Sequence, residues 1–195
     1  MENRKSSLKL LAKINIMSLY ECFTEISDPR KESGLRLPLP ALLCMITMCY
    51  MSGHSGYRST ATFMEGNKDE FMEMFNLKHP PIRKTQLRTV LQMLDFKAIN
   101  EAFFKWMNNF VTIEKGEWLS GNGKALASTI KDAHGSAQDF EMMVRLFNQK
   151  LQVVTQMTTT KSKKGEMKAM QNLLKNLELK GVTITMDALH CQKKQ

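Results

Sequence analysis

Asp187 is the carboxylate of this chain whose position is best suited to catalysis. It follows the β-branched run Val182–Met186, and a strand would fix the direction of a side chain at its end. Mg²⁺ prefers carboxylate oxygens and keeps open positions for substrate phosphate, and a pair of such ions supports phosphodiester cleavage. The alternative for a single aspartate at this place is a helix cap or a turn residue.

The other residues with metal-ligand chemistry do not form a motif. No pair of cysteines or histidines has the close spacing of a zinc site. Cys44 and Cys49 lie in an apolar run and are predicted to be buried thiols, and His190 beside Cys191 lacks further ligands nearby. Asn122-Gly123 ends a short strand-like segment, which favours a turn.

Three lysines, Lys161, Lys163 and Lys164, stand close together in the polar stretch Thr158–Gly165. Such a stretch is either a solvated loop or a contact for the phosphates of DNA, since phosphate contacts supply affinity without reading sequence. The lysines alone leave both interpretations open.

The first half of the chain is predicted to be helical, because its apolar residues recur at helical spacing. The expected helices are Ile16–Phe23, Ala41–Met51, Tyr57–Glu65, Phe71–Leu77, Lys84–Leu94 and Asn100–Val111. Ala41–Met51 is apolar on nearly every side, which predicts burial all round. Lys84–Leu94 has an apolar stripe with Lys84 and Arg88 facing outward; it is either a DNA recognition helix or a core helix with a wet basic face.

The second half changes character. A strand over Trp118–Gly123, a hairpin of Phe140–Phe147 and Leu151–Met157, a helix over Glu166–Leu179 and a strand over Val182–Asp187 are expected in this order. Gly181 is placed to end the helix. The pattern predicts an α+β protein with a helical domain at 1–115 and a sheet domain at 116–195.

The charge of the chain favours an anionic partner. Its 28 Lys and Arg exceed its 19 Asp and Glu, which gives a net charge of +9. Such a surface attracts nucleic acid first and anionic membranes second. The N-terminus has no signal-peptide pattern, and the apolar run Ala41–Met51 is too short to span a bilayer. We therefore expect no membrane anchoring, and the lack of a disulfide framework among the four cysteines favours a reducing cytoplasm.

Four stretches of the chain, in the same order and spacing, resemble the H-repeat-associated insertion-sequence transposases, which are DDE enzymes. They are Ile26–Leu39, Met51–Phe63, Gly121–Leu126 and Val182–Lys193. The resemblance implies a helical N-terminal region followed by an RNase H-like core with a mixed sheet and a helix. It also implies Mg²⁺ as cofactor, the DNA ends of the element as partner, and intact transposase subunits as further partners.

Within this resemblance, Asp187 matches the second catalytic aspartate and is a metal ligand by descent. The first catalytic position holds Asn122, whose neutral amide would bind Mg²⁺ far less well than a carboxylate. The third carboxylate of the family, a glutamate, belongs further along than Gln195. The resemblance therefore predicts a truncated RNase H-like core that does not bind Mg²⁺ productively.

Basic residues near the site of such a core face phosphate, which marks Lys124, Lys161, Lys163 and Lys164 as candidate DNA contacts. Three hypotheses for function stay open on the sequence. The chain is an inactive transposase copy that retains DNA binding, a repurposed DNA-binding or regulatory protein derived from a transposase, or a pseudogene product without activity.

Overall fold

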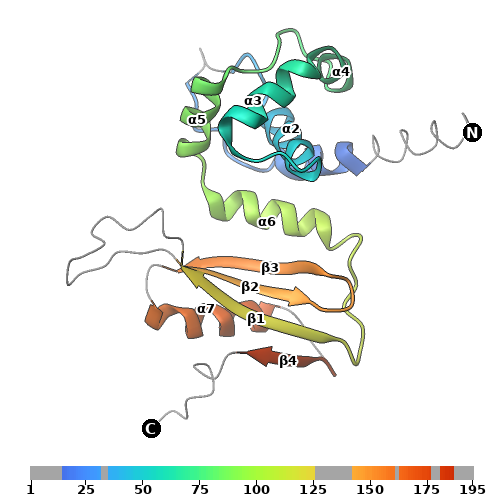
Figure 1. Ribbon diagram of the computed structural model, residues 1–195, viewed down its shortest axis with the longest axis vertical. Coiled ribbons are helices and arrows are strands. Elements are labelled where there is room, and N and C mark those ends of the chain that lie inside the picture. Colours follow the sequence, from blue (N-terminus) through green and yellow to red (C-terminus); the bar gives the residue numbers. More distant parts are fainter. Residues whose placement is uncertain (1–14, 32–34, 126–141, 161–162, 177–180, 187–195) are drawn as a thin grey trace, which may run out of the picture. The chain divides into compact units, whose positions relative to one another are not determined.

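The computed structural model describes residues 15–31, 35–125, 142–160, 163–176 and 181–186 (Figure 1). The chain forms two compact units, Met1–Trp106 and Met107–Gln195. The first is helical and the second carries the sheet, so the predicted α+β fold is confirmed. The predicted boundary between residues 115 and 116 falls in the segment between α6 (Phe96–Met107) and β1 (Trp118–Ala125).

The helical unit begins, in its described part, with a helix at residues 15–23. It continues with α2 (Leu39–Met51), α3 (Gly56–Gly66), α4 (Lys68–Met74), α5 (Lys84–Met93) and α6. These helices share one apolar core. Among its fully buried side chains are Leu19, Phe23, Leu42, Phe71 and Leu87. None of the helices in the described part of the chain combines the length and apolar character that crossing a membrane requires.

The predicted burial of helix α2 is confirmed for most of its length and is wrong for its last turn. Proline stands in its first turn, where a missing N–H costs no hydrogen bond. Cys44 and Cys49 are buried as predicted, and burial raises the pKa of the Cys44 thiol to about 12. Burial all round is wrong for the last turn, because Tyr50 and Met51 are 54% and 76% exposed. The chain leaves the core there and turns at Gly53, which has a left-handed φ of +81°.

Helices α4 and α6 start three and four residues earlier than their apolar spacing predicted. Helix α6 begins at Phe96 because the Asp95 carboxylate accepts a 2.8 Å hydrogen bond from the backbone N–H of Lys97, as an N-cap does. Helix α4 ends at Met74, shortly before Asn76 takes a left-handed φ of +49°. A capping residue thus sets the start of α6, and a left-handed residue follows the end of α4.

The second unit holds a four-stranded mixed sheet in the order β3-β2-β1-β4. Its strands are β1, β2 (Met142–Asn148), β3 (Val153–Thr160) and β4 (Thr183–Met186). β2 pairs antiparallel with both β1 and β3, and β4 pairs parallel with β1. The predicted hairpin is therefore confirmed, and so is the predicted order of strand, hairpin, helix and strand.

Two local predictions in this unit are wrong. Asn122-Gly123 does not form a turn, because both residues lie inside β1, opposite Arg145 and Val144. The stretch Thr158–Gly165 is not one loop: β3 runs to Thr160, and α7 (Lys163–Asn176) starts soon after it. Threonine is β-branched and suits a strand. In both places the backbone groups are paired with β2, and local turn propensity takes no account of such pairing.

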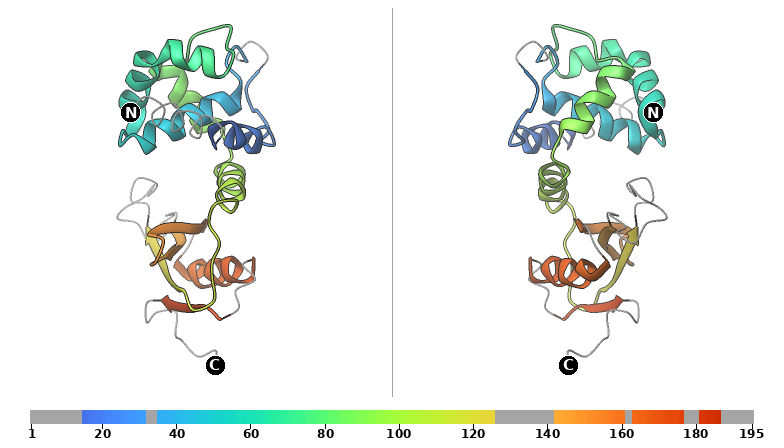
Figure 2. Two further views of the ribbon diagram at one scale, coloured as in Figure 1. Left: turned by 90° about the vertical axis from the view of Figure 1, so that its right-hand side faces the viewer. Right: turned by 90° about the vertical axis from the view of Figure 1, so that its left-hand side faces the viewer.

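Helix α7 packs against β2 and β3 on one face of the sheet (Figures 1 and 2). Val144, Leu146, Met170 and Leu173 form the buried core between them. The helix also comes close to β1, because a Cβ on Gly121 would lie 2.8 Å from Met170 Cε. The glycines of β1 thus allow a close helix–sheet approach.

A buried polar cluster joins the start of β1 to the turn after β2. Glu117 and Asn148 are 5% and 0% exposed, and Asn148 Nδ2 donates a 2.7 Å hydrogen bond to Glu117 Oε2. Asn148 Oδ1 accepts 3.0 Å bonds from the backbone N–H groups of Lys150 and Leu151. Lys150 Nζ lies 3.1 Å from Glu117 Oε1. The cluster satisfies every group that it buries and holds the β2–β3 turn in place.

Candidate nucleic-acid interface

Asn122, the predicted first catalytic position, lies in β1 with its side chain exposed. Residues alternate between the two faces of a strand, so Asn122 shares with Ser120 the face opposite to Gly121 and α7. On that face Ser120 Oγ lies 3.2 Å from Thr185 Oγ1 in β4. The second predicted ligand, Asp187, lies outside the described residues.

The donors described on this face do not fit a Mg²⁺ site. Asn122 and the two hydroxyls are neutral, and the cross-strand partner of Asn122 is the cation Arg145. Glu166 is on the other side of the sheet, where its side chain fills the space beside Gly123. No cluster of three acidic, histidine or cysteine side chains occurs in the described residues, whereas Mg²⁺ sites are built on carboxylates.

The predicted DNA-contacting lysines are only partly placed. Lys124 is exposed in β1, two residues from Asn122 and therefore on the same face. Lys163 and Lys164 form the first turn of α7, which corrects their assignment to a loop; their side chains are not described. Lys161 lies outside the described residues.

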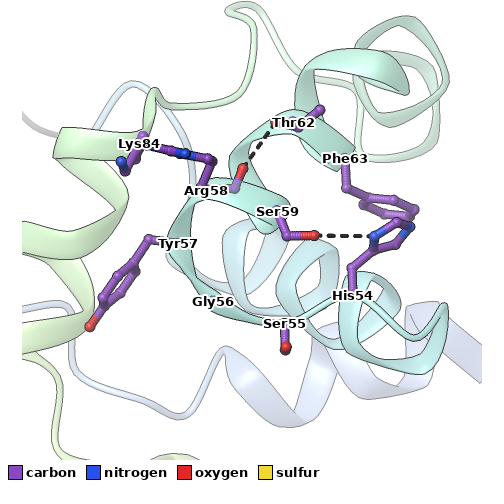
Figure 3. Close-up of a pocket in the computed structure, with 9 residues that line it drawn as sticks. All are labelled: His54, Ser55, Gly56, Tyr57, Arg58, Ser59, Thr62, Phe63 and Lys84. Atoms are coloured by element: carbon purple, nitrogen blue, oxygen red, sulfur yellow. Dashed lines mark hydrogen bonds between the residues drawn. The ribbon is translucent and has the colours of Figure 1, made fainter.

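The helical unit contains a cationic site that sequence reasoning missed. A solvent-open cavity of about 700 Å³ lies between α3 and α5, and Figure 3 shows the side chains that line it. We call it the cationic cavity, and its lining residues are His54, Ser55, Gly56, Tyr57, Arg58, Ser59, Thr62, Phe63 and Lys84. Arg58 and Lys84 reach it from different helices, and both are exposed. Among the described lining residues, only these two side chains carry a permanent charge, and none of the lining residues is a carboxylate.

Local contacts shape the wall of this cavity. His54 Nδ1 lies 3.1 Å from Ser59 Oγ, and its ring packs on Phe63 with centroids 5.4 Å apart. Thr62 Oγ1 donates a 3.0 Å bond to the carbonyl of Arg58. Gly53 and Gly56 both have left-handed φ values, +81° and +79°, which glycine adopts without a steric cost. The two glycines thus turn the chain sharply between α2 and α3.

The arrangement favours an anion. The Ser55 side chain makes no capping bond to α3, and the first turn of a helix carries unpaired N–H groups and partial positive charge. This field adds to the charges of Arg58 and Lys84. A phosphate group would meet cations and hydroxyl donors here without an opposing carboxylate among the described lining residues.

The sequence carried part of the signal for this cavity, because all of its lining residues except Lys84 lie in the stretch Met51–Phe63. Arg58 and Lys84 are far apart in the chain, and no short motif links them. The turn Gly53-His-Ser-Gly56 and the outward position of Lys84 were visible, but only the packing of α3 on α5 brings them together.

Comparison with known proteins shows what the chain is similar to. Residues 20–107 match the family model described as DDE_Tnp_1-associated. The chain is 25% identical over 181 residues to "Putative transposase YncI" of Escherichia coli O157:H7 and of Escherichia coli K12, and 24% identical to "H repeat-associated putative transposase YhhI" of Escherichia coli K12. The chain is related to the H repeat-associated transposases. This confirms the resemblance that its motifs indicated.

The relationship to these transposases extends along most of the chain but not along most of each relative. Each of the three alignments covers 92% of this chain. The chain spans about half the length of two of them, 46% and 47%, and 72% of the third. No solved structure matches the chain. The comparisons therefore support a transposase-related function.

Proposed function

We propose that this transposase relative binds duplex DNA through its helical unit and does not cut it. The observation that carries the proposal is the cationic cavity, where Arg58 and Lys84 meet at the first turn of α3. The net charge of +9 supports it, because phosphate contacts dominate the affinity of proteins for DNA. The DNA bound is proposed to include the ends of a transposable element, as the names of the relatives suggest.

The proposed lack of cleavage depends on Asn122. A metal-dependent nuclease of the RNase H-like class needs a carboxylate at this place in the first strand, and Asn122 offers an amide. The neighbouring described groups are hydroxyls and the cation Arg145, which oppose rather than assist the binding of Mg²⁺. On this proposal, the chain is a transposase-derived DNA-binding protein that does not bind Mg²⁺ productively.

Binding to duplex DNA should be strong at low salt and should weaken steeply as salt is added. The logarithm of the binding constant falls by about 0.9 per phosphate contact for each unit of log salt. The double variant Arg58→Gln/Lys84→Gln should therefore lower the slope by roughly 2. Fluorescence anisotropy with a labelled duplex measures both quantities.

The control for this experiment is Lys78→Gln/Lys175→Gln, which removes the same charge from two exposed positions outside the cavity. It should leave most of the slope unchanged. If the unmodified chain binds DNA at low salt no better than a neutral protein of similar size, the proposed function is wrong. Equal losses in both double variants would assign the affinity to net charge instead of to the cavity.

The chain should leave DNA uncut in the presence of Mg²⁺ or Mn²⁺, because Asn122 lacks the charge that holds the ion. Nicking of supercoiled plasmid and cleavage of duplexes with element ends are the measurements. Asn122→Asp adds a carboxylate at an exposed position, and we expect it to raise Mg²⁺ affinity in titration calorimetry. Metal-dependent cleavage by the unmodified chain that disappears in Asn122→Ala would overturn this prediction.

A further inference from the structure

Helix α5 presents a polar, cationic surface. Thr85, Arg88, Thr89 and Gln92 are exposed and stand at the spacing that places residues on one helix face. We call this set the reading face. The whole of α5, KTQLRTVLQM, contains no acidic residue, so an anionic partner would meet no repulsion from it.

The reading face is flanked on one side by the cationic cavity, and its residues Thr85 and Thr89 line a second cavity. Lys84, on one flank of the helix, lines the cationic cavity together with Arg58 of α3 (Figure 3). Gln86, on the opposite flank, also lines this second cavity, which has a volume of about 360 Å³. The residues of this second cavity are Arg30, Lys31, Ile82, Thr85, Gln86, Thr89, Val90 and Met93. Its charged lining residues, Arg30 and Lys31, are again cations.

Arg30 forms part of the wall of the second cavity. Its side chain is 5% exposed and is held by Asp28, with Nη2 2.6 Å from Oδ2 and Nε 2.9 Å from Oδ1. Nη2 also donates to the carbonyl of Leu37 at 2.8 Å. No described group accepts a bond from the buried Nη1. Since Nη1 is itself buried and the guanidinium is paired with Asp28, Lys31 is the exposed cation that this cavity offers to a phosphate.

The opposite side of α5 fixes the helix to the unit. Leu87 and Val90 are 0% and 7% exposed, and α5 packs against α3. The backbone of Arg83 donates to Gln86 Oε1 at 3.2 Å, which caps the helix start. The reading face therefore projects from a rigid support.

We propose that α5 is a recognition helix that enters the major groove of duplex DNA, with the two cavities receiving phosphates on either side. This inference rests on the proposed function and specifies the surface that performs it. A helix of ten residues is about 15 Å long, and the groove is about 12 Å wide. Arginine pairs with guanine, glutamine pairs with adenine, and the threonine methyl contacts thymine, so the reading face carries side chains suited to base edges.

The experiment selects duplexes with a random central segment against the full chain and sequences the bound fraction. The unmodified chain should enrich a preferred sequence. Arg88→Ala and Gln92→Ala should each lose the preference at a defined position, with affinity for the enriched duplex falling on the order of 10-fold to 100-fold. Lys78→Ala, at an exposed position outside α5, should keep the preference.

Arg88→Lys separates base reading from phosphate contact. Lysine keeps the charge but loses the bidentate fork of arginine, so the base preference should fall while the salt dependence stays the same. If Arg88→Lys leaves the preference intact, or if salt-dependent binding shows no preferred sequence in the unmodified chain, α5 is not a recognition helix, although DNA binding stands. Absence of DNA binding altogether would overturn the proposed function as well. Since these side chains are exposed, unchanged melting curves verify that each variant is folded.

Discussion

Phe71→Ala should destabilise the helical unit by about 3–5 kcal/mol, the usual effect of truncating a buried phenylalanine. Phe71 is 2% exposed and packs between Phe63 and Phe75, with centroid distances of 5.9 and 6.4 Å. Domains are stable by only about 5–15 kcal/mol, so a large part of the stability of this unit depends on one side chain. Phe63 also lines the cationic cavity, and the variant should therefore weaken DNA binding.

Urea unfolding followed by tryptophan fluorescence measures this effect in one unit at a time. The chain has two tryptophans, Trp106 in the first unit and Trp118 in the second. A Trp118→Phe background therefore reports on the helical unit. Phe96→Ala is the matched control, because Phe96 is 44% exposed and its loss should cost far less. Equal shifts in the two variants would show that the aromatic cluster around Phe71 does not hold the unit together.

Asn148→Ala should have a comparable effect on the sheet unit. The side chain is fully buried and makes three hydrogen bonds, two to the following turn and one to the Glu117 carboxylate. Their loss should cost about 2–4 kcal/mol, because hydrogen bonds to charged groups are worth more than neutral ones. Urea unfolding of the variant in a Trp106→Phe background, followed by the fluorescence of Trp118, measures this loss of stability. A shift no larger than that of Gln149→Ala, at an exposed neighbour, would contradict the prediction.

The pH dependence of the free energy of unfolding in the Asn148→Asp variant tests the same polar cluster. Hydrogen bonds from Asn148 and Lys150 hold the pKa of Glu117 below its ordinary value of 4.5. The folded protein therefore binds fewer protons than the unfolded chain in that range, and stability is lost as the pH falls through the folded pKa.

In Asn148→Asp two carboxylates face each other, which raises the folded pKa of the pair. Stability should then rise on acidification from neutral pH, which is opposite to the unmodified chain. Gln149→Asp adds the same charge at an exposed position and should keep the original direction.

Much of the helical unit could be predicted from the sequence. Leu87 and Val90 are buried where helical spacing placed them, and Cys44 and Cys49 are buried in the run that predicted it. Such patterns are local: the period of apolar residues records which side of an element faces the core. The similarity to transposases could also be recognised from the sequence, because four motifs keep their order along the chain.

The tertiary structure decided what no local pattern encodes. Asn122-Gly123 has turn propensity, yet it lies inside β1 because β2 supplies a ladder partner for each of the two residues. Asn148 lies between the two predicted strands of the hairpin, and nothing in that local pattern indicates that its side chain is a buried partner of Glu117.

The cationic cavity exists because α3 packs on α5 and brings Arg58 and Lys84 together. Periodicity and propensity report the environment of a residue within its own element. A site made by two elements depends on how their faces meet, and only the folded chain determines that.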